Sequence, residues 1–123
     1  MSELHDECGV FGIYKNNENM NIADETYLAL YALQHRGQIG AGIAVNKDGN
    51  MKYFKGHGMI PEAIPEKELS RLGSGRIALG HVKYSSGEAV DHENLAPLFM
   101  RYIKGQLANC RNGSITNFSE LRE

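Results

Sequence analysis

The 123-residue sequence contains no tryptophan, only three prolines and only two cysteines. Two cysteines are no disulfide framework and suit a reducing compartment, although a bond between Cys8 and Cys110 is compatible with the sequence. There is also no CxxC pair and no cluster of histidine and cysteine with metal-ligand spacing. We therefore expect neither a metal nor another cofactor.

Long apolar runs and a strong excess of one charge are missing as well. No run approaches the roughly 20 residues that a membrane span needs, and the acidic start, residues 1–7, lacks the apolar core of a signal peptide. The formal net charge of −2 gives no reason to expect nucleic acid or an anionic membrane as a partner. The sequence thus indicates a single cytoplasmic domain.

Glycine, in contrast, is abundant, with 14 residues, which indicates strands joined by tight corners. Hydrophobic periodicity predicts strands at 9–14, 41–45, 51–55, 77–82, 98–103 and 106–110, and helices at 24–35 and 66–72. We expect Asp24 to cap the first helix, Arg36 to lie in its last turn, and Asp48-Gly49 to form a hairpin turn. Residues 56–65 and 83–96 are predicted as loops, and Asn117 as the cap of a helix near the chain end.

One stretch near the start carries a candidate nucleophile. Cys8 precedes a short apolar run in which Gly9 and Gly12 leave room for close backbone approach. Taken alone, this pattern also fits an ordinary buried cysteine, because free cysteine is among the most buried residue types. The interpretation therefore depends on the rest of the chain.

Four short sequence segments follow one another along the chain in a characteristic order. They are CGVFGI at 8–13, LQHRGQ at 33–38 followed by AGI at 41–43, GHVKYSS at 80–86, and RNGSITN at 111–117. Their content and order resemble the class II glutamine amidotransferase domain, and most closely that of the amidophosphoribosyltransferases of purine biosynthesis. The resemblance extends from Glu7 to Arg122.

The resemblance implies an α+β fold of the N-terminal-nucleophile type, an αββα sandwich of antiparallel sheets, of which this chain would form a part. It also implies that residues 1–7 are a leader that is removed, and that residues 8–123 are the N-terminal part of the amidotransferase domain.

A chemistry follows from the same resemblance. Cys8 would become residue one, and its own α-amine would act as general base for its thiol, because an α-amine titrates near pH 8. The thiolate would attack the side-chain amide of glutamine and form a thioester, releasing ammonia and then glutamate. Asn112 and Gly113 would stabilise the oxyanion.

The family's substrate-binding positions fall on Arg36, Lys83, Tyr84 and Ser86. Lys83 stands where the family has an arginine, and an ammonium cannot form the planar bidentate contact that a guanidinium makes with a carboxylate. Simpler roles remain open for all of these residues: Arg36 as a cation at a helix end, Tyr84 as a packing residue, Lys83 as a solvated surface charge and Ser86 as an ordinary loop residue. Asn112 and Gly113 likewise fit a simple hairpin turn.

Two functions remain open at this point. The first is a glutaminase of the amidophosphoribosyltransferase type. The second is a catalytically inactive, truncated relative that acts as a binding, regulatory or structural module. The second is favoured by Lys83, by Arg111 in place of a histidine, and by Glu7, because an attached Glu7 leaves Cys8 without a free amine.

The expected partners are glutamine as substrate, together with either a second copy of the chain or a phosphoribosyltransferase part. A partial sandwich exposes apolar strand faces and edges, which favours association into a homo-oligomer.

Overall fold

The computed structural model describes residues 8–17, 19–34, 38–84 and 95–110, and for Cys8 it describes the backbone only. The strands are β1 (Cys8–Tyr14), β2 (Gln38–Lys47), β3 (Asn50–His57), β4 (Ile77–Tyr84), β5 (Leu98–Tyr102) and β6 (Gly105–Asn109). The helices are α1 (Ile22–Leu33), α2 (Ile60–Ala63) and α3 (Glu66–Leu72). The predicted final helix at Asn117 lies outside the described residues.

A four-stranded antiparallel sheet with the order β1-β4-β2-β3 is the centre of the fold. The β2–β3 hairpin turns through Asp48 and Gly49, whose φ angles are 53° and 78°. Positive φ at both central positions is typical of the type I′ turn, which matches the twist of the flanking strands. The prediction of a hairpin at Asp48-Gly49 is therefore confirmed.

The first helix begins earlier than predicted. Its N-cap is Asn21, whose side-chain oxygen accepts a hydrogen bond from the backbone N–H of Asp24 at 3.1 Å. The prediction of Asp24 as the cap was wrong, because Asp24 lies in the first turn, where its carboxylate suits the positive end of the helix dipole. The helix ends at Leu33, so the prediction of Arg36 in its last turn was also wrong.

The predicted loop at 56–65 is partly regular. Strand β3 continues to His57, and the one-turn helix α2 follows. Proline is tolerated in the first turn of a helix, because the N–H groups there have no partner within the helix. The turn forms because Ile60 and Ala63 are buried against the sheet.

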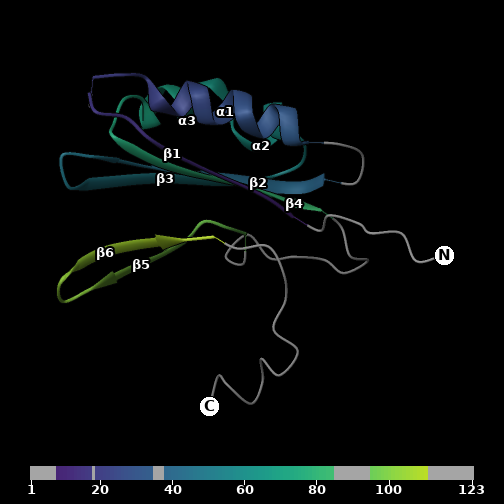
Figure 1. The fold of residues 1–123 in the computed structure, drawn as a ribbon. Coiled ribbons are helices and arrows are strands. Elements are labelled where there is room, and N and C mark those ends of the chain that lie inside the picture. Colours follow the sequence, from purple (N-terminus) through teal and green to yellow (C-terminus); the bar gives the residue numbers. More distant parts are fainter. Residues whose placement is uncertain (1–7, 18, 35–37, 85–94, 111–123) are drawn as a thin grey trace, which may run out of the picture.

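The elements stack in three layers, shown in Figure 1. The helices cover one face of the four-stranded sheet, and the β5–β6 hairpin lies against the other face. Tyr53 on β3 stacks on Phe99 on β5, with ring centroids 4.6 Å apart. The predicted α+β class with antiparallel sheets is confirmed, and within the described residues the layers are helix, sheet and sheet.

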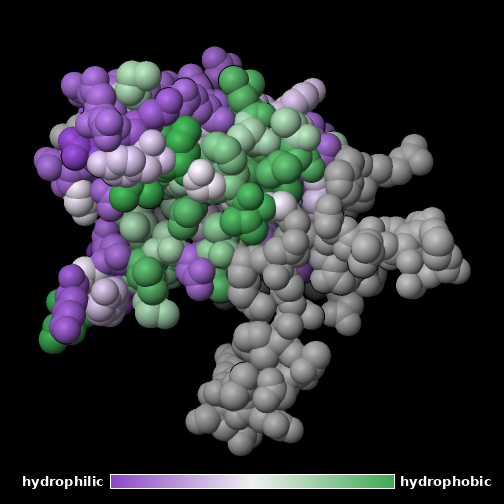
Figure 2. Space-filling model, in the orientation of Figure 1, coloured by the Kyte–Doolittle hydropathy of each residue, from purple (hydrophilic) through white to green (hydrophobic). Residues whose placement is uncertain are grey.

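The outer surface is uneven in polarity. In Figure 2 the helical side is mainly hydrophilic at its top, and hydrophobic residues gather across the middle of the visible face. The exposed large hydrophobic residues of the chain include Val10, Tyr14, Leu28, Tyr31, Met100 and Leu107. Apolar surface therefore remains uncovered on several elements.

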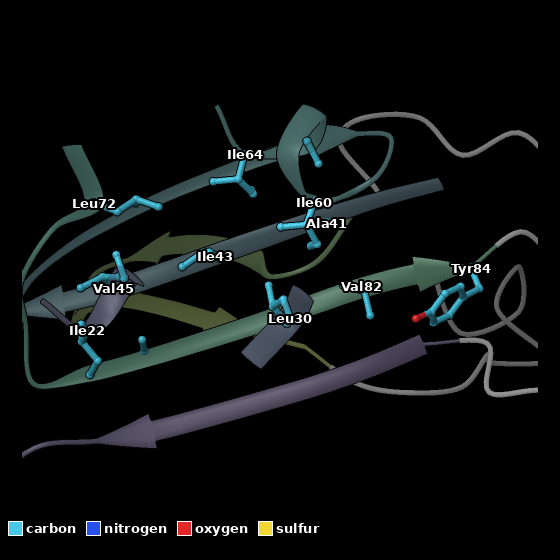
Figure 3. Packing of buried hydrophobic residues seen from close by; sticks show 13 residues of the cluster. Ile22, Leu30, Ala41, Ile43, Val45, Ile60, Ile64, Leu72, Val82 and Tyr84 are labelled. Carbon is cyan, nitrogen blue, oxygen red and sulfur yellow. The ribbon is translucent and has the colours of Figure 1, made fainter. Parts of the chain in front are cut away.

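The hydrophobic core fills the space between the helices and the sheet, as Figure 3 shows. Ile22 and Leu30 of α1 are fully buried against Ile43 and Val82 of the central strands. Burial of one such side chain contributes about 1.5–3 kcal/mol relative to its exposure to water. Within the described ranges, no helix is long and apolar enough to cross a membrane.

Candidate active site

The antiparallel register aligns Cys8 with Lys83. Cys8 of β1 pairs directly with Lys83 of β4, and Lys83 pairs on its other side with Gly40 of β2. Gly40 in turn pairs with His57 of β3. Residues that are directly opposite in an antiparallel sheet share a face, so these four form one row across the sheet.

The neighbouring row has the same pattern. Val10 pairs with His81, His81 pairs with Gly42, and Gly42 pairs with Lys55. Both rows lie on the face opposite the helices. On this face, two glycines of β2 therefore lie between two pairs of basic or titratable residues. The pair on β4 is His81 and Lys83, and the pair on β3 is Lys55 and His57.

Residues 95–97 lie on these glycines. A Cβ atom at Gly42 would lie 2.1 Å from the carbonyl oxygen of Ala96, and one at Gly40 would lie 2.7 Å from Cδ2 of Leu95. The absence of side chains at both positions is thus what permits this close approach. The segment covers part of the sheet, and Lys55 and His81 are only 8% and 3% exposed.

The charged residues that the strands bring to this face are all of one kind. None of the four strands of the sheet contains aspartate or glutamate, whereas the two rows nearest Cys8 hold Lys55, His57, His81 and Lys83. The strands themselves therefore contribute positive or titratable side chains, and no carboxylate, to this end of the face.

The segment around Arg36 is anchored on both sides by glutamines. The side-chain oxygen of Gln34 accepts a hydrogen bond from the backbone N–H of Ile60 at 2.9 Å, and Nε2 of Gln38 donates to the carbonyl of Gly58 at 3.1 Å. These contacts fix the two ends of a segment whose centre, residues 35–37, lies outside the described residues.

Comparisons with known proteins identify relatives of this chain. No protein-family model matches the chain. The amidophosphoribosyltransferase of Staphylococcus aureus strain MRSA252 is 39% identical over 122 residues, which is 99% of this chain and 24% of that protein. The enzyme of the same name from Methanocaldococcus jannaschii is 43% identical over 117 residues, which is 94% of this chain and 24% of that protein.

Solved structures agree in fold as well as sequence. The glutamine phosphoribosylpyrophosphate amidotransferase of B. subtilis, solved with ADP and GMP, matches with a TM-score of 0.75 and 38% identity over 92% of this chain and 23% of its own. A structure described as the allosteric regulatory enzyme of purine biosynthesis matches with a TM-score of 0.70 and 40% identity over 80% of this chain and 21% of its own. This chain is homologous to part of amidophosphoribosyltransferase.

The chain spans about a quarter of the length of the amidophosphoribosyltransferases that it matches. The family resemblance inferred from the four segments is confirmed, and the N-terminal-nucleophile fold that it implied matches the solved amidophosphoribosyltransferase structures.

The structure places two of the predicted substrate-binding residues on opposite faces. Lys83 is half-buried on the same face as Cys8. Tyr84, the next residue, points to the helix face, where it is 5% exposed and its hydroxyl donates a hydrogen bond to the carbonyl of Leu33 (Figure 3). Tyr84 therefore ties the end of α1 to the end of β4, next to Lys83.

The remaining predicted site residues of the amidophosphoribosyltransferase motif, Arg36, Ser86, Asn112 and Gly113, lie outside the described residues. The described part of the chain holds no group of three or more metal-ligating side chains. An apolar cleft of about 190 Å³ lies between the sheet and the hairpin, lined in part by Ala44, Ile77 and Ala108. It adjoins the rows farthest from Cys8, so it is separate from the candidate site.

The sequence interpretation missed Lys55 and His57, the two residues of β3 that lie opposite Gly42 and Gly40. A signal was available for Lys55, because it lies on the predicted strand at 51–55 that follows the hairpin turn, whereas His57 fell in the predicted loop at 56–65. The Asp48-Gly49 turn fixes the register of β2 and β3, and that register puts Lys55 opposite Gly42. The step that a sequence cannot supply is the pairing of β2 with β4.

Proposed function

We propose that this chain hydrolyses the side-chain amide of glutamine, with Cys8 as nucleophile and glutamate and ammonia as products. The observation that carries the proposal is the pairing of Cys8 with Lys83 in a sheet whose four strands contain no aspartate or glutamate. The similarity to a glutamine phosphoribosylpyrophosphate amidotransferase supports glutamine as the substrate. Lys83 supplies a positive charge for the α-carboxylate of that glutamine.

The proposed reaction requires a free amine on the nucleophile. Removal of residues 1–7 leaves residues 8–123, and the new α-amine of Cys8 takes the proton of its own thiol. The sulfur then bonds to the amide carbon, and the amide nitrogen leaves as ammonia after it receives that proton. Water attacks the resulting thioester at the same carbon, releases glutamate and restores the thiol.

The other groups act around this centre. Asn112 and the backbone N–H of Gly113 donate hydrogen bonds to the oxyanion that forms on the amide oxygen. Arg36 and Ser86 contact the glutamine, each carried over from the family motif. For Tyr84 the buried position supports a positioning role, because its hydroxyl bonds to the carbonyl of Leu33 and not to the face of Cys8.

The ammonia needs an acceptor. Because the chain covers about a quarter of its amidophosphoribosyltransferase relatives, we place the acceptor reaction on an associated phosphoribosyltransferase part in the cytoplasm. A second copy of this chain is the other partner that we propose, because apolar residues stay exposed on several elements.

The test is an assay of ammonia release from glutamine by the wild-type chain, by Cys8→Ala and by Cys110→Ala. We expect Cys8→Ala to lose all enzymatic ammonia release, because no nucleophile remains, whereas Cys110→Ala retains the wild-type rate. Cys110 is a matched control because it is the second cysteine of the chain and lies directly after β6.

Equal ammonia release by the wild type and Cys8→Ala would overturn the proposal. Such a result would leave the inactive relative, a binding or regulatory module with the same fold. The similarity to enzymes over nearly the whole chain supports the catalytic function over that alternative.

A further inference from the structure

Strand β1 forms an edge of the four-stranded sheet that lacks the usual protection. Among the described residues it has a partner strand on one side alone, β4. Its seven residues, CGVFGIY, include no charge and no proline, the residues that commonly keep an edge strand from pairing with another chain. None of residues 9–14 is buried, and Val10 and Tyr14 are 44% and 60% exposed. This edge is therefore open to a further strand.

The opposite edge of the sheet, at β3, is guarded. Nη2 of Arg71 on α3 donates a hydrogen bond to the carbonyl oxygen of Tyr53 at 2.9 Å. Nζ of Lys52 on β3 donates in return to the carbonyl oxygen of Arg71 at 3.3 Å. Lysines and a covering helix are common protection for an edge strand. The residues therefore favour β1 over β3 as the edge that accepts another strand.

One side of helix α1 continues the surface of the β1 edge. The helix packs over β1 and β4 (Figure 1). A Cβ at Gly9 would lie 3.3 Å from Leu33 Cδ1, and Glu25 forms an ion pair of 3.1 Å with Lys15, which directly follows β1. Residues spaced by four lie on one face of a helix, so Ala29 shares the β1 side with Glu25 and Leu33.

This side of α1 is apolar apart from the paired Glu25. Leu28 and Ala32 form the neighbouring row of the helix, and Leu28 and Leu33 are 65% and 39% exposed. The two alanines, at 29 and 32, leave room for another helix to approach closely. An open strand edge and an apolar helix side are thus continuous with each other.

The geometry of this surface fits a two-fold axis. Gly12 is midway between residues 9 and 15, and Ala29 is midway between 25 and 33, so an axis perpendicular to the sheet at Gly12 passes close to Ala29. Strands lie about 4.8 Å apart, which puts α1, above β1 and β4, about 5 Å from this axis. The two copies of α1 would then lie about 10 Å apart, which is a normal helix packing distance.

We propose that β1 pairs antiparallel with β1 of a second copy of this chain, with Gly12 opposite Gly12. In this register Val10 lies opposite Tyr14 of the second copy, and Phe11 lies opposite Ile13. Each pair joins an aromatic to a β-branched side chain, a favourable cross-strand combination, and no like charges meet. The inference specifies the second copy named under the proposed function, and it requires no glutaminase activity.

The test places a charge on the proposed axis. Gly12 is exposed, and among the described residues a Cβ there would meet Leu79 Cδ2 alone, at 3.6 Å, so the single chain can accept a side chain. In Gly12→Lys two like charges face each other across the axis, and we expect association to weaken by about tenfold or more. Gly12→Glu should behave in the same way. Light scattering over a range of chain concentrations measures the mass.

A mixture of the two variants is the decisive comparison. Gly12→Lys and Gly12→Glu present opposite charges to each other, so an equimolar mixture should regain the higher mass that each alone has lost. Gly12→Ala is the matched control, because it adds a Cβ without a charge and should associate as the wild type does. Unchanged association of both charged variants, or a mixture with no greater mass than either alone, would overturn the inference.

Hydrogen exchange of the wild-type chain locates the contact without any variant. Pairing engages the outward amides of β1, so residues 9–14 should exchange more slowly at high than at low chain concentration. The guarded strand β3 should show no such difference. Equal exchange of residues 9–14 at the two concentrations would also overturn the inference. Neither measurement uses glutamine, so the inference and the proposed glutaminase activity can fail separately.

Discussion

Gly42 shows how a single residue shapes the candidate site. The face of the sheet can accept residues 95–97 only where β2 has no side chain, and the close contact at Gly42 involves the backbone oxygen of Ala96. Backbone cannot move aside as a flexible side chain can. A substitution at this position should therefore displace the segment that covers Lys55 and His81.

We predict that Gly42→Ala lowers the free energy of unfolding by about 1–3 kcal/mol, the usual cost of overpacking. Gly12→Ala is the matched control, because among the described residues a Cβ at Gly12 would meet Leu79 Cδ2 alone, at an ordinary 3.6 Å. We expect Gly12→Ala to be neutral or slightly stabilising, since alanine has less conformational freedom to lose than glycine. Urea unfolding measures both, and equal midpoints for the two variants would contradict the assigned contact.

The site residues differ in how far sequence alone could locate them. Cys8 and Lys83 were identified from the family motifs, but their pairing depends on strands that are about 70 residues apart in sequence. Tyr84 illustrates the remaining difficulty, because residues 83 and 84 of one strand necessarily point to opposite faces. Motif matching assigned both to the same pocket, whereas the backbone places the Tyr84 hydroxyl against Leu33.

At the scale of elements, the strands and α3 were largely predicted, and the errors lie at ends and short turns. Alternating and apolar patterns are strong signals, whereas a helix start depends on which of several capable side chains makes the first hydrogen bond. Both Asn21 and Asp24 could cap α1 by residue type. The structure selects Asn21, and this choice makes Ile22, Thr26 and Leu30 one buried stripe.

The cap can be tested directly. We predict that Asn21→Ala destabilises the fold by about 1 kcal/mol, because the N–H of Asp24 loses its acceptor at the start of α1. Asn16→Ala, in the exposed loop before the helix, should change stability by less than about 0.5 kcal/mol. Thermal unfolding followed by circular dichroism compares the two. A larger loss for Asn16→Ala than for Asn21→Ala would refute the cap.

At the scale of the whole molecule, the layered fold leaves apolar surface without a cover in the described residues. The outward side of the β5–β6 hairpin has Met100 paired with Leu107, and these residues are 58% and 48% exposed. The overall class could be predicted because family motifs span the chain. Which surfaces remain open could not be predicted, since exposure depends on how the layers stack.

We predict that the chain forms a dimer or larger assembly in solution through this outward side of the hairpin. Met100→Glu should shift it towards the monomer, because a carboxylate in an apolar contact loses its hydration. Met20→Glu serves as control, at a methionine that is 44% exposed outside the hairpin. Light scattering after size-exclusion chromatography measures the mass. A monomeric wild type would rule out the association.

The central claim is that Cys8 attacks the side-chain amide of glutamine once its own amine is free. Its most direct test is ammonia release by the chain produced with Cys8 as its first residue, beside the same chain with residues 1–7 attached. We predict glutamine-dependent release from the first form, none from its Cys8→Ala variant, and a much lower rate from the second form. Release at background level from the chain that begins at Cys8 would contradict the claim.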